Sequence, residues 1–272
     1  MTPRGRNDVV LNERHIQQLQ ERGIDPELAA RFGWTSSDHL GGSLAIPYVR
    51  RGEIVNHKYR TLGKDKRFSQ DSDATKCLWN DDILDDDTLK DHPVIITEGE
   101  MDALAAIQCG FKRTVSVPDG APAEPLGGAS GAKYSYLDEA MARLREATII
   151  ILAVDGDKAG ANLFHDLVLR LGRARCKFVT YPFKRSNREQ RCKDLNEVLK
   201  EWGEKGVDET ISKAQWARLD GIHKMSELPP LPENPIMDIG FDEPLDSLIK
   251  ARRGDFWVLT GAPGQGKTAL PI

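Results

Sequence analysis

Two short acidic motifs follow apolar runs in the middle of the chain. Residues 98–102 read E-G-E-M-D directly after the run 94–97, and residues 155–157 read D-G-D directly after the run 149–154. If both runs are parallel strands, the carboxylates lie at one edge of a sheet, where open α/β sheets place their ligands. Two carboxylates about 4 Å apart repel by roughly 1–4 kcal/mol, which favours a cation between them.

The candidate metal ligands are the four acids of these motifs, Glu98, Asp102, Asp155 and Asp157. Mg²⁺ suits them because it takes carboxylate oxygens and keeps sites for water and substrate phosphates. One or two such ions can activate a hydroxyl and stabilise a leaving pyrophosphate. A fifth acid, Asp194, could extend the metal site, although capping of the next helix is the simpler interpretation of that residue alone. The same simpler interpretation, caps of helices and turns, stands against the whole set.

A second candidate site lies at residues 261–268, which read Gly-Ala-Pro-Gly-Gln-Gly-Lys-Thr. This is the pattern of a P-loop, and the apolar run 256–260 is the strand expected before it. Backbone amides at glycines would approach phosphates, a lysine would bind β/γ oxygens and a threonine would hold Mg²⁺. These positions are Gly261, Gly264, Gly266, Lys267 and Thr268.

A P-loop acts only inside a complete nucleotide-binding domain, and four residues follow this one. We therefore expect it to be inactive in this chain, which measurable ATP hydrolysis would refute. We also expect residues 236–272 to be poorly ordered or to dock on the preceding part of the chain.

The elements that must position the acids alternate from residue 93 onward. Strands are predicted at 94–97, 114–117, 148–154 and 177–181. Helices are predicted at 101–109, 137–146, 160–171, 194–202 and 209–219. Strands with helical crossovers predict an α/β fold with a mainly parallel sheet, covered by helices on both faces.

The residues before this pattern predict a smaller α+β unit. Asn12 and Asp25 can cap two short helices, and the segments 43–49 and 54–61 alternate like the strands of a hairpin. The expected division is a flexible tail at 1–10, an N-terminal subdomain at 11–92, the parallel-sheet domain at 93–203, a helical and proline-rich linker at 204–238 and the P-loop segment at 239–272.

Composition limits the possible classes of protein. The net charge of −4 argues against a globally basic nucleic-acid binder. Lys and Arg nevertheless dominate the segments 50–67 and 173–193, which could form a track for a polyanion, although a solvated surface is the simpler interpretation of each. The chain has 4 cysteines and no C-x₂-C pair, so we expect reduced thiols, no zinc and a cytoplasmic protein. No apolar run reaches membrane-spanning length, so we expect no membrane partner.

The paired acidic motifs resemble the Toprim signature of DnaG-type primases, topoisomerases and some nucleases. Over roughly residues 12–272 the chain resembles the phage-type primase–helicase family, which includes Twinkle. The stretches that carry this resemblance are 46–48, 56–60, 98–104, 116–121, 155–160, 192–197, 239–241 and 245–246. The resemblance implies a Rossmann-like Toprim domain, an RNA-polymerase-like α+β subdomain before it and the beginning of a RecA-type helicase domain after it.

The resemblance also implies roles for individual residues. Glu98, Asp155 and Asp157 would be catalytic, with Mg²⁺ or Mn²⁺ as cofactor, and Glu98 would assist deprotonation of a primer 3′-hydroxyl. The cations that would contact template or nucleotide phosphates are Lys58, Arg60, Lys64, Lys66 and Lys193. Tyr59 and Phe68 could stack on bases, although packing inside a strand is the simpler interpretation of each.

The function that the resemblance implies is RNA primer synthesis from NTPs on single-stranded DNA, as the primase portion of a primase–helicase. ATP would serve the helicase of a longer protein, which would form a hexameric or heptameric ring, whereas this chain is expected to be monomeric. The expected setting is the cytoplasm of a bacterium or a phage-infected cell.

Two alternatives stay open. The Toprim part could be catalytically idle and bind single-stranded DNA to regulate the helicase, or it could be a nuclease. Family members usually carry an N-terminal zinc domain, and no cysteine precedes Cys77 here. This leaves open weak priming, a separate recognition factor or a domain kept for DNA binding.

Overall fold

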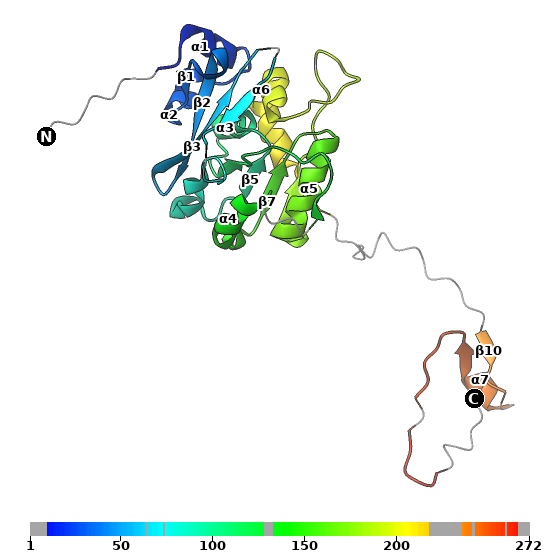
Figure 1. The fold of residues 1–272 in the computed structure, drawn as a ribbon. Helices are drawn as coiled ribbons and strands as arrows, with labels where there is room; N and C mark the ends of the chain where they lie inside the picture. Colours follow the sequence, from blue (N-terminus) through cyan, green and yellow to red (C-terminus); the bar gives the residue numbers. More distant parts are fainter. Residues whose placement is uncertain are drawn as a thin grey trace. The chain divides into compact units, whose positions relative to one another are not determined.

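The computed structural model describes residues 10–63, 65–72, 74–127, 133–217, 236–240, 243–258 and 260–265. By its contacts the chain divides into two compact units, residues 1–220 and 221–272. The segments 11–92 and 93–203, which the sequence treats as separate domains, therefore share one compact unit. Figure 1 shows each as a sheet with its helices, blue to cyan for the first and green to yellow for the second.

The N-terminal part combines two helices with an antiparallel sheet. The helices are α1 (Glu13–Gln20) and α2 (Pro26–Arg31), and the strands are β1 (Thr35–Ser37), β2 (Ser43–Arg50), β3 (Glu53–Arg60) and β4 (Phe68–Gln70), in the order β1-β2-β3-β4. The Asn12 and Asp25 carboxamide and carboxylate oxygens accept from backbone N–H groups of the first turns, so both predicted helix caps are confirmed. The predicted hairpin is also confirmed, as β2 and β3.

The second sheet has five strands in the order β6-β5-β7-β8-β9. They are β5 (Val94–Thr97), β6 (Thr114–Ser116), β7 (Ile150–Ala153), β8 (Cys176–Phe178) and β9 (Gln215–Trp216). β9 pairs antiparallel to β8, and the other neighbours pair in parallel. The helices are α3 (Glu100–Gln108), α4 (Ser135–Glu146), α5 (Lys158–Leu171) and α6 (Leu195–Ser212). The predicted mainly parallel α/β sheet is confirmed.

Alternating residues of the central strands face two separate cores. Ile95 and Ile151 pack in a cluster with residues of α3 and α6, whereas Val94 and Ile150 pack in a cluster with residues of α4 and α5. Because side chains of a strand alternate between the two faces, this pattern places α3 and α6 on one face and α4 and α5 on the other.

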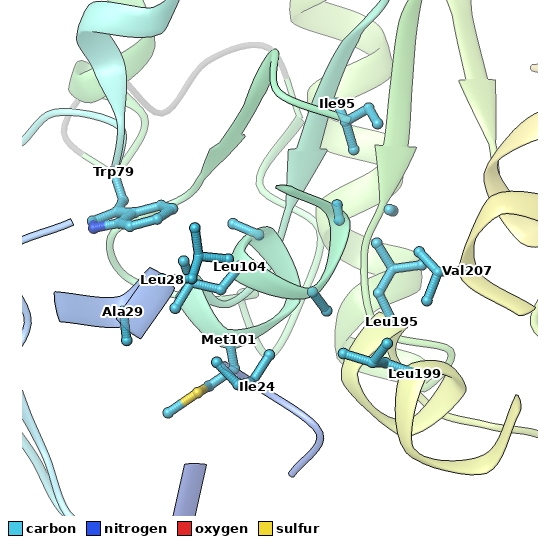
Figure 2. Close-up of a cluster of buried hydrophobic side chains, with 14 of the residues drawn as sticks. Ile24, Leu28, Ala29, Trp79, Ile95, Met101, Leu104, Leu195, Leu199 and Val207 are labelled. Carbon is cyan, nitrogen blue, oxygen red and sulfur yellow. The ribbon is translucent and has the colours of Figure 1, made fainter. Parts of the chain in front are cut away.

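Helix α3 lies between the second sheet and the N-terminal helices. Met101 and Leu104 of α3 pack with Leu28 of α2 in the same cluster that holds Ile95 of β5 and Leu195 of α6, and Figure 2 shows these side chains together. A helix with partners on opposite sides is buried on most of its surface, and residues 100–106 of α3 are all buried, including the charged Glu100 and Asp102. The same cluster contains Leu44, Ile46 and Tyr48 of β2, so α3 and the N-terminal sheet share one core.

Two predicted elements are wrong. The helix expected at 209–219 ends at Ser212, because α6 continues from the first predicted helix with a break at Gly203 (φ 67°), and residues 215–216 instead pair with the edge strand β8 as β9. The strand expected at 256–260 is not formed at residues 256–258, where Phe256 is 91% exposed. Within the described part of the second unit, no neighbouring strand covers these side chains.

The remaining elements are short. The second unit contains β10 (Ile236–Asp238), α7 (Leu245–Leu248) and β11 (Lys250–Arg252), and β10 and β11 pair antiparallel. Single 3₁₀ turns lie at His39–Gly41, Asp81–Asp85, Asp87–Leu89 and Arg173–Arg175. None of the helices that the structure describes combines the length and apolar character needed to span a bilayer.

Candidate active site

A cleft of about 810 Å³ lies between the two sheets of the first unit. One side, which we call the acidic wall, consists of Glu98, Asp102, Asp155 and Asp194. The facing side, which we call the basic wall, consists of Lys58, Arg60, Lys66 and Phe68. Other lining residues include Arg22, Glu100, Asp119 and Lys193.

Three carboxylates of the acidic wall converge. Asp102 lies in the first turn of α3, Asp155 follows β7, and Asp194 precedes α6. One oxygen of each lies within 4.8 Å of the others. Burial, and then the charges of the other two aspartates, raise the pKa of Asp102 well above its ordinary value. Burial is also the main cause of the raised pKa values of Asp155 and Asp194. Ionising these three aspartates at neutral pH therefore lowers the stability of the folded protein.

Asp194 both caps a helix and belongs to the three-aspartate group. Its Oδ1 accepts from Glu197 N at 2.7 Å, which caps α6, and one of its carboxylate oxygens belongs to the three-aspartate group. The neighbouring Asn196 N donates to Asp102 Oδ1 at 3.0 Å, so the start of α6 is tied to the first acidic motif. The sequence allowed two interpretations of Asp194, as a helix cap or as a member of the acidic group. The structure shows that both hold together.

Glu98 lies beside this group rather than within it. Its two carboxylate oxygens accept from Ala121 N at 3.3 Å and from Asp155 N at 3.4 Å. Burial, followed by the charge of Asp155, raises the pKa of Glu98 to about 7. Glu98 lies near Asp155 because β5 and β7 are adjacent parallel strands, but it is not one of the three converging carboxylates, as the four-acid site expected from sequence would require.

Asp157 does not join the three aspartates. The prediction that all four motif acids meet around one point is therefore wrong. Its Oδ1 accepts from Gly160 N at 2.9 Å and caps α5, while Oδ2 lies 3.0 Å from Lys193 Nζ. Lys193 Nζ also contacts Asp155 Oδ2 at 2.9 Å. Asp157 is therefore connected to the acidic wall through a lysine, and its cap geometry explains why it points elsewhere.

Two glycines allow the acidic turn after β7 to form. A Cβ on Gly160 would lie 2.0 Å from Asp155 O, a distance that no side chain can accommodate. Gly156 N donates to Lys193 O at 2.7 Å, and a Cβ at Gly156 would lie 3.2 Å from the Tyr181 ring. The turn is thereby held against the segment that carries Lys193 and Asp194.

Lys58 of the basic wall is already paired. Its Nζ lies 2.6 Å from Glu100 Oε1 and 2.9 Å from Pro118 O, and the residue is 8% exposed. The same Glu100 oxygen accepts from Tyr48 Oη at 2.5 Å. Burial alone would raise the pKa of Glu100, but Lys58 and the Tyr48 hydroxyl hold it below its ordinary value. Two of the three N–H donors of Lys58 are therefore committed inside the protein.

Arg60 and Phe68 form the open part of the basic wall. Arg60 Nε is buried with no hydrogen-bond partner among the described residues, and its guanidinium lies 5.4 Å from the centre of the Phe68 ring. Phe68 is 53% exposed, so the interpretation of it as packed inside a strand is wrong. Tyr59 instead packs on His39, with ring centres 4.4 Å apart, and donates to Asp71.

The structure describes only some of the remaining predicted binding residues. Lys66 is exposed and lines the cleft. Lys64 lies outside the described residues, as do Gly266, Lys267 and Thr268 of the P-loop pattern. Gly261 and Gly264 are described, and Gly264 has a φ of 83°.

Among the lining residues that sequence reasoning missed, three are charged and lie beside the acidic or basic wall, namely Asp119, Glu100 and Arg22. Asp119 follows β6 at the same sheet edge as the acidic motifs, so the reasoning used for them could have found it. It accepts from Lys76 Nζ at 2.6 Å. Glu100 stands inside the first motif but was assigned no role. Arg22 comes from the turn after α1, and no local pattern marks it.

Comparisons with known proteins agree on one group. A family model described as Toprim-like matches residues 95–199. The Twinkle homolog protein of Arabidopsis thaliana is 33% identical over 243 residues, covering 83% of this chain and 32% of that protein. The primase homolog protein of the same plant is 36% identical over 177 residues, covering 63% of this chain and 50% of that protein.

Among solved structures, the primase fragment of the bacteriophage T7 primase-helicase protein has a TM-score of 0.52 and 24% identity, covering 77% of this chain and 82% of that one, which shows a shared fold. The chain spans about a third to a half of the length of the two plant relatives. With the acidic motifs at the carboxyl edge of the matched sheet, the chain belongs to the Toprim proteins of the Twinkle-like, phage-primase type.

Proposed function

We propose that this chain is the primase portion of a primase–helicase, which synthesises short RNA primers from NTPs on single-stranded DNA. The observation that carries the proposal is the group formed by Asp102, Asp155 and Asp194 within 4.8 Å, opposite a basic wall in one cleft. Such a pairing of acids with cations fits a reaction that joins two phosphate-bearing substrates.

The donor set fits a hard divalent ion. Three carboxylates are crowded and their pKa values are raised, so the fold holds repelling oxygens where a cation would relieve the repulsion. Asp102, Asp155 and Asp194 would hold Mg²⁺ or Mn²⁺, with Glu98 and Asp157 at the margin. When bound, the ion would supply activation of a hydroxyl and stabilisation of a leaving pyrophosphate.

The protein residues would bind and orient the substrates. Arg60, whose buried Nε has no partner among the described residues, and the exposed Lys66 are suited to phosphates of template or nucleotide. Phe68 would stack on a base. Lys58 would hold Glu100, and with it the N-terminus of α3, in place. Glu98, which faces the cleft beside Asp155, would accept the proton of a primer 3′-hydroxyl.

The rest of the proposal concerns a longer protein. Residues 11–92 and 93–203 would act as the RNA-polymerase-like subdomain and the Toprim domain, and residues 204–238 would link them to a helicase domain that begins at 239–272. ATP binding at the P-loop, helicase activity and assembly into a hexameric or heptameric ring would belong to that protein.

The test is incorporation of labelled NTPs on mixed single-stranded templates with Mn²⁺. We expect short RNA products from the wild type, and none from Asp155→Asn. A matched control is Asp138→Asn, which removes an exposed carboxylate on α4 outside the cleft and should leave synthesis unchanged. Absence of product from the wild type, or equal product from Asp155→Asn, would contradict the proposal. Shortened template strands would instead indicate a nuclease.

One observation favours a second candidate, a catalytically idle module that binds single-stranded DNA. Lys193 contacts both Asp155 and Asp157, so part of the acidic charge is balanced without an ion. Such a module would bind DNA in a salt-dependent way, weaken on Arg60→Ala and incorporate no nucleotide.

A further inference from the structure

Lys193 bridges two aspartates that belong to different parts of the site. Its Nζ lies 2.9 Å from Oδ2 of Asp155, a member of the three-aspartate group, and 3.0 Å from Oδ2 of Asp157, the cap of α5. An ammonium at this position balances carboxylate charge at the edge of the candidate metal site. A cation bound to Asp155 from the same side would therefore compete with Lys193.

The backbone of Lys193 is held by hydrogen bonds, whereas its side chain is partly exposed to solvent. Lys193 O accepts from Gly156 N at 2.7 Å, and Lys193 N donates to Glu197 Oε2 at 2.9 Å. The next residue, Asp194, is itself one of the three aspartates. The side chain is 48% exposed and lines the cleft. Because its backbone is held in place, the ammonium can turn away from the two aspartates and into the cleft.

The contrast with Lys58 shows what is special about Lys193. The Lys58 side chain is 10% exposed and its partner Glu100 is 1% exposed, so separating this pair would leave two charges in a dry interior. Lys193 and Asp157 are about half exposed, so water can solvate both when they separate. Asp155 is 16% exposed, and the arriving divalent ion would take the place of the ammonium beside it. Lys58 is therefore held in its ion pair by burial, whereas Lys193 can leave its aspartates for solvent.

We propose that Lys193 is a tethered counter-ion of Asp155 and Asp157 that gives up these aspartates when a divalent ion binds, and that its freed ammonium then binds a phosphate of the nucleotide. This inference rests on the proposed function. It makes ion binding and nucleotide binding favour each other through one side chain, and such coupling is reciprocal.

The experiment measures binding of Mn²⁺ alone, by the electron paramagnetic resonance signal of the free ion, to the folded wild-type chain and to Lys193→Met. A lysine that served only to bind phosphate would leave the ion affinity unchanged when it is lost. If Lys193 competes with the ion, Lys193→Met binds Mn²⁺ roughly ten-fold more tightly, in keeping with the loss of one half-exposed ion pair, with Asp157, and one mostly buried pair, with Asp155.

Two further variants control for charge and for folding. Lys158→Met removes an equal charge from the exposed residue after Asp157, which forms no ion pair with either aspartate in the described part of the chain. It should change the Mn²⁺ affinity by less than about two-fold. Lys193→Arg keeps the charge and should restore an affinity close to that of the wild type.

A second measurement tests the coupling by titrating CTP with and without Mn²⁺. Mn²⁺ should strengthen CTP binding in the wild type more than in Lys193→Met. Equal or weaker Mn²⁺ binding by Lys193→Met, while the wild type binds the ion, would overturn the role of Lys193 and leave the metal site standing. No Mn²⁺ binding by either protein would overturn the metal site itself, and the inference with it.

Discussion

The acidic wall and the basic wall of the cleft face each other but are stabilised in opposite ways. The basic wall contains a buried ion pair, Lys58 with Glu100, whose charges satisfy one another inside the fold. The acidic wall gathers four carboxylates with raised pKa values, three of which converge. The comparison indicates that the basic wall contributes to holding the sheets together, whereas the acidic wall keeps an unfavourable arrangement that a bound cation would relieve.

The largest effect should come from the turn that supports the acidic wall. Gly160→Ala would place a Cβ 2.0 Å from Asp155 O, so the backbone must shift, and we expect a loss of about 3–4 kcal/mol in the free energy of unfolding. Gly52→Ala is the control, because Gly52 has φ 76° but nothing within 4 Å, and should cost about 1 kcal/mol. Urea unfolding measures both, and equal stability of the two variants would contradict the account of this turn.

Breaking the ion pair of the basic wall should have the next largest effect. Glu100→Gln leaves Lys58 charged and buried, which should lower the free energy of unfolding by about 3 kcal/mol. Adding Lys58→Met in the same chain should recover most of that loss, because no unpaired charge remains. Denaturant unfolding of the two variants tests this, and an unaffected single variant would mean that the pair does not support the wall.

These two walls also differ in how far they could be predicted from sequence. Asp102 and Asp155 could be placed because each follows a short apolar strand at a known edge of a parallel sheet. The pairing of Lys58 with Glu100 could not, since it joins β3 to the first residue of α3 across 42 positions of the chain. The sequence could not decide between helix cap and metal ligand for Asp194, because the two aspartates near it come from distant parts of the chain. The helix expected at 209–219 failed for a related reason, as pairing with β8 outweighs local helix propensity at residues 215–216.

A smaller effect is expected at the open part of the basic wall. Phe68→Ala should weaken binding of single-stranded DNA by about ten-fold through lost stacking, with little change in stability because the ring is 53% exposed. Tyr59→Phe is the matched control, because the Tyr59 hydroxyl donates to Asp71 and the ring packs on His39. Fluorescence anisotropy at one fixed salt concentration compares them, and a weaker Tyr59→Phe with an unchanged Phe68→Ala would reverse our assignment.

The smallest effect is a gain in stability. Burial and the neighbouring aspartates raise the pKa of Asp102 above the value of 3.8 in an unfolded chain, so the folded protein holds more protons and loses stability as the pH rises above about 4. Asp102→Asn should remove this loss and stabilise the metal-free protein by about 1 kcal/mol at pH 7. Thermal unfolding with a chelator measures the change, and a less stable variant would show that the repulsion is not there.

The central claim, that three aspartates form a cation site, is tested most directly by the affinity for Mn²⁺ of Asp194→Asn. Asparagine still caps α6, so the helix is kept while one charge leaves the group. Asp157→Asn makes the same change at the cap of α5, outside the group. Our account predicts that Asp194→Asn binds Mn²⁺ at least about ten-fold more weakly than the wild type, with a thermal stability no lower than that of the wild type and a smaller effect of Asp157→Asn on the affinity. Wild-type affinity in Asp194→Asn would contradict it.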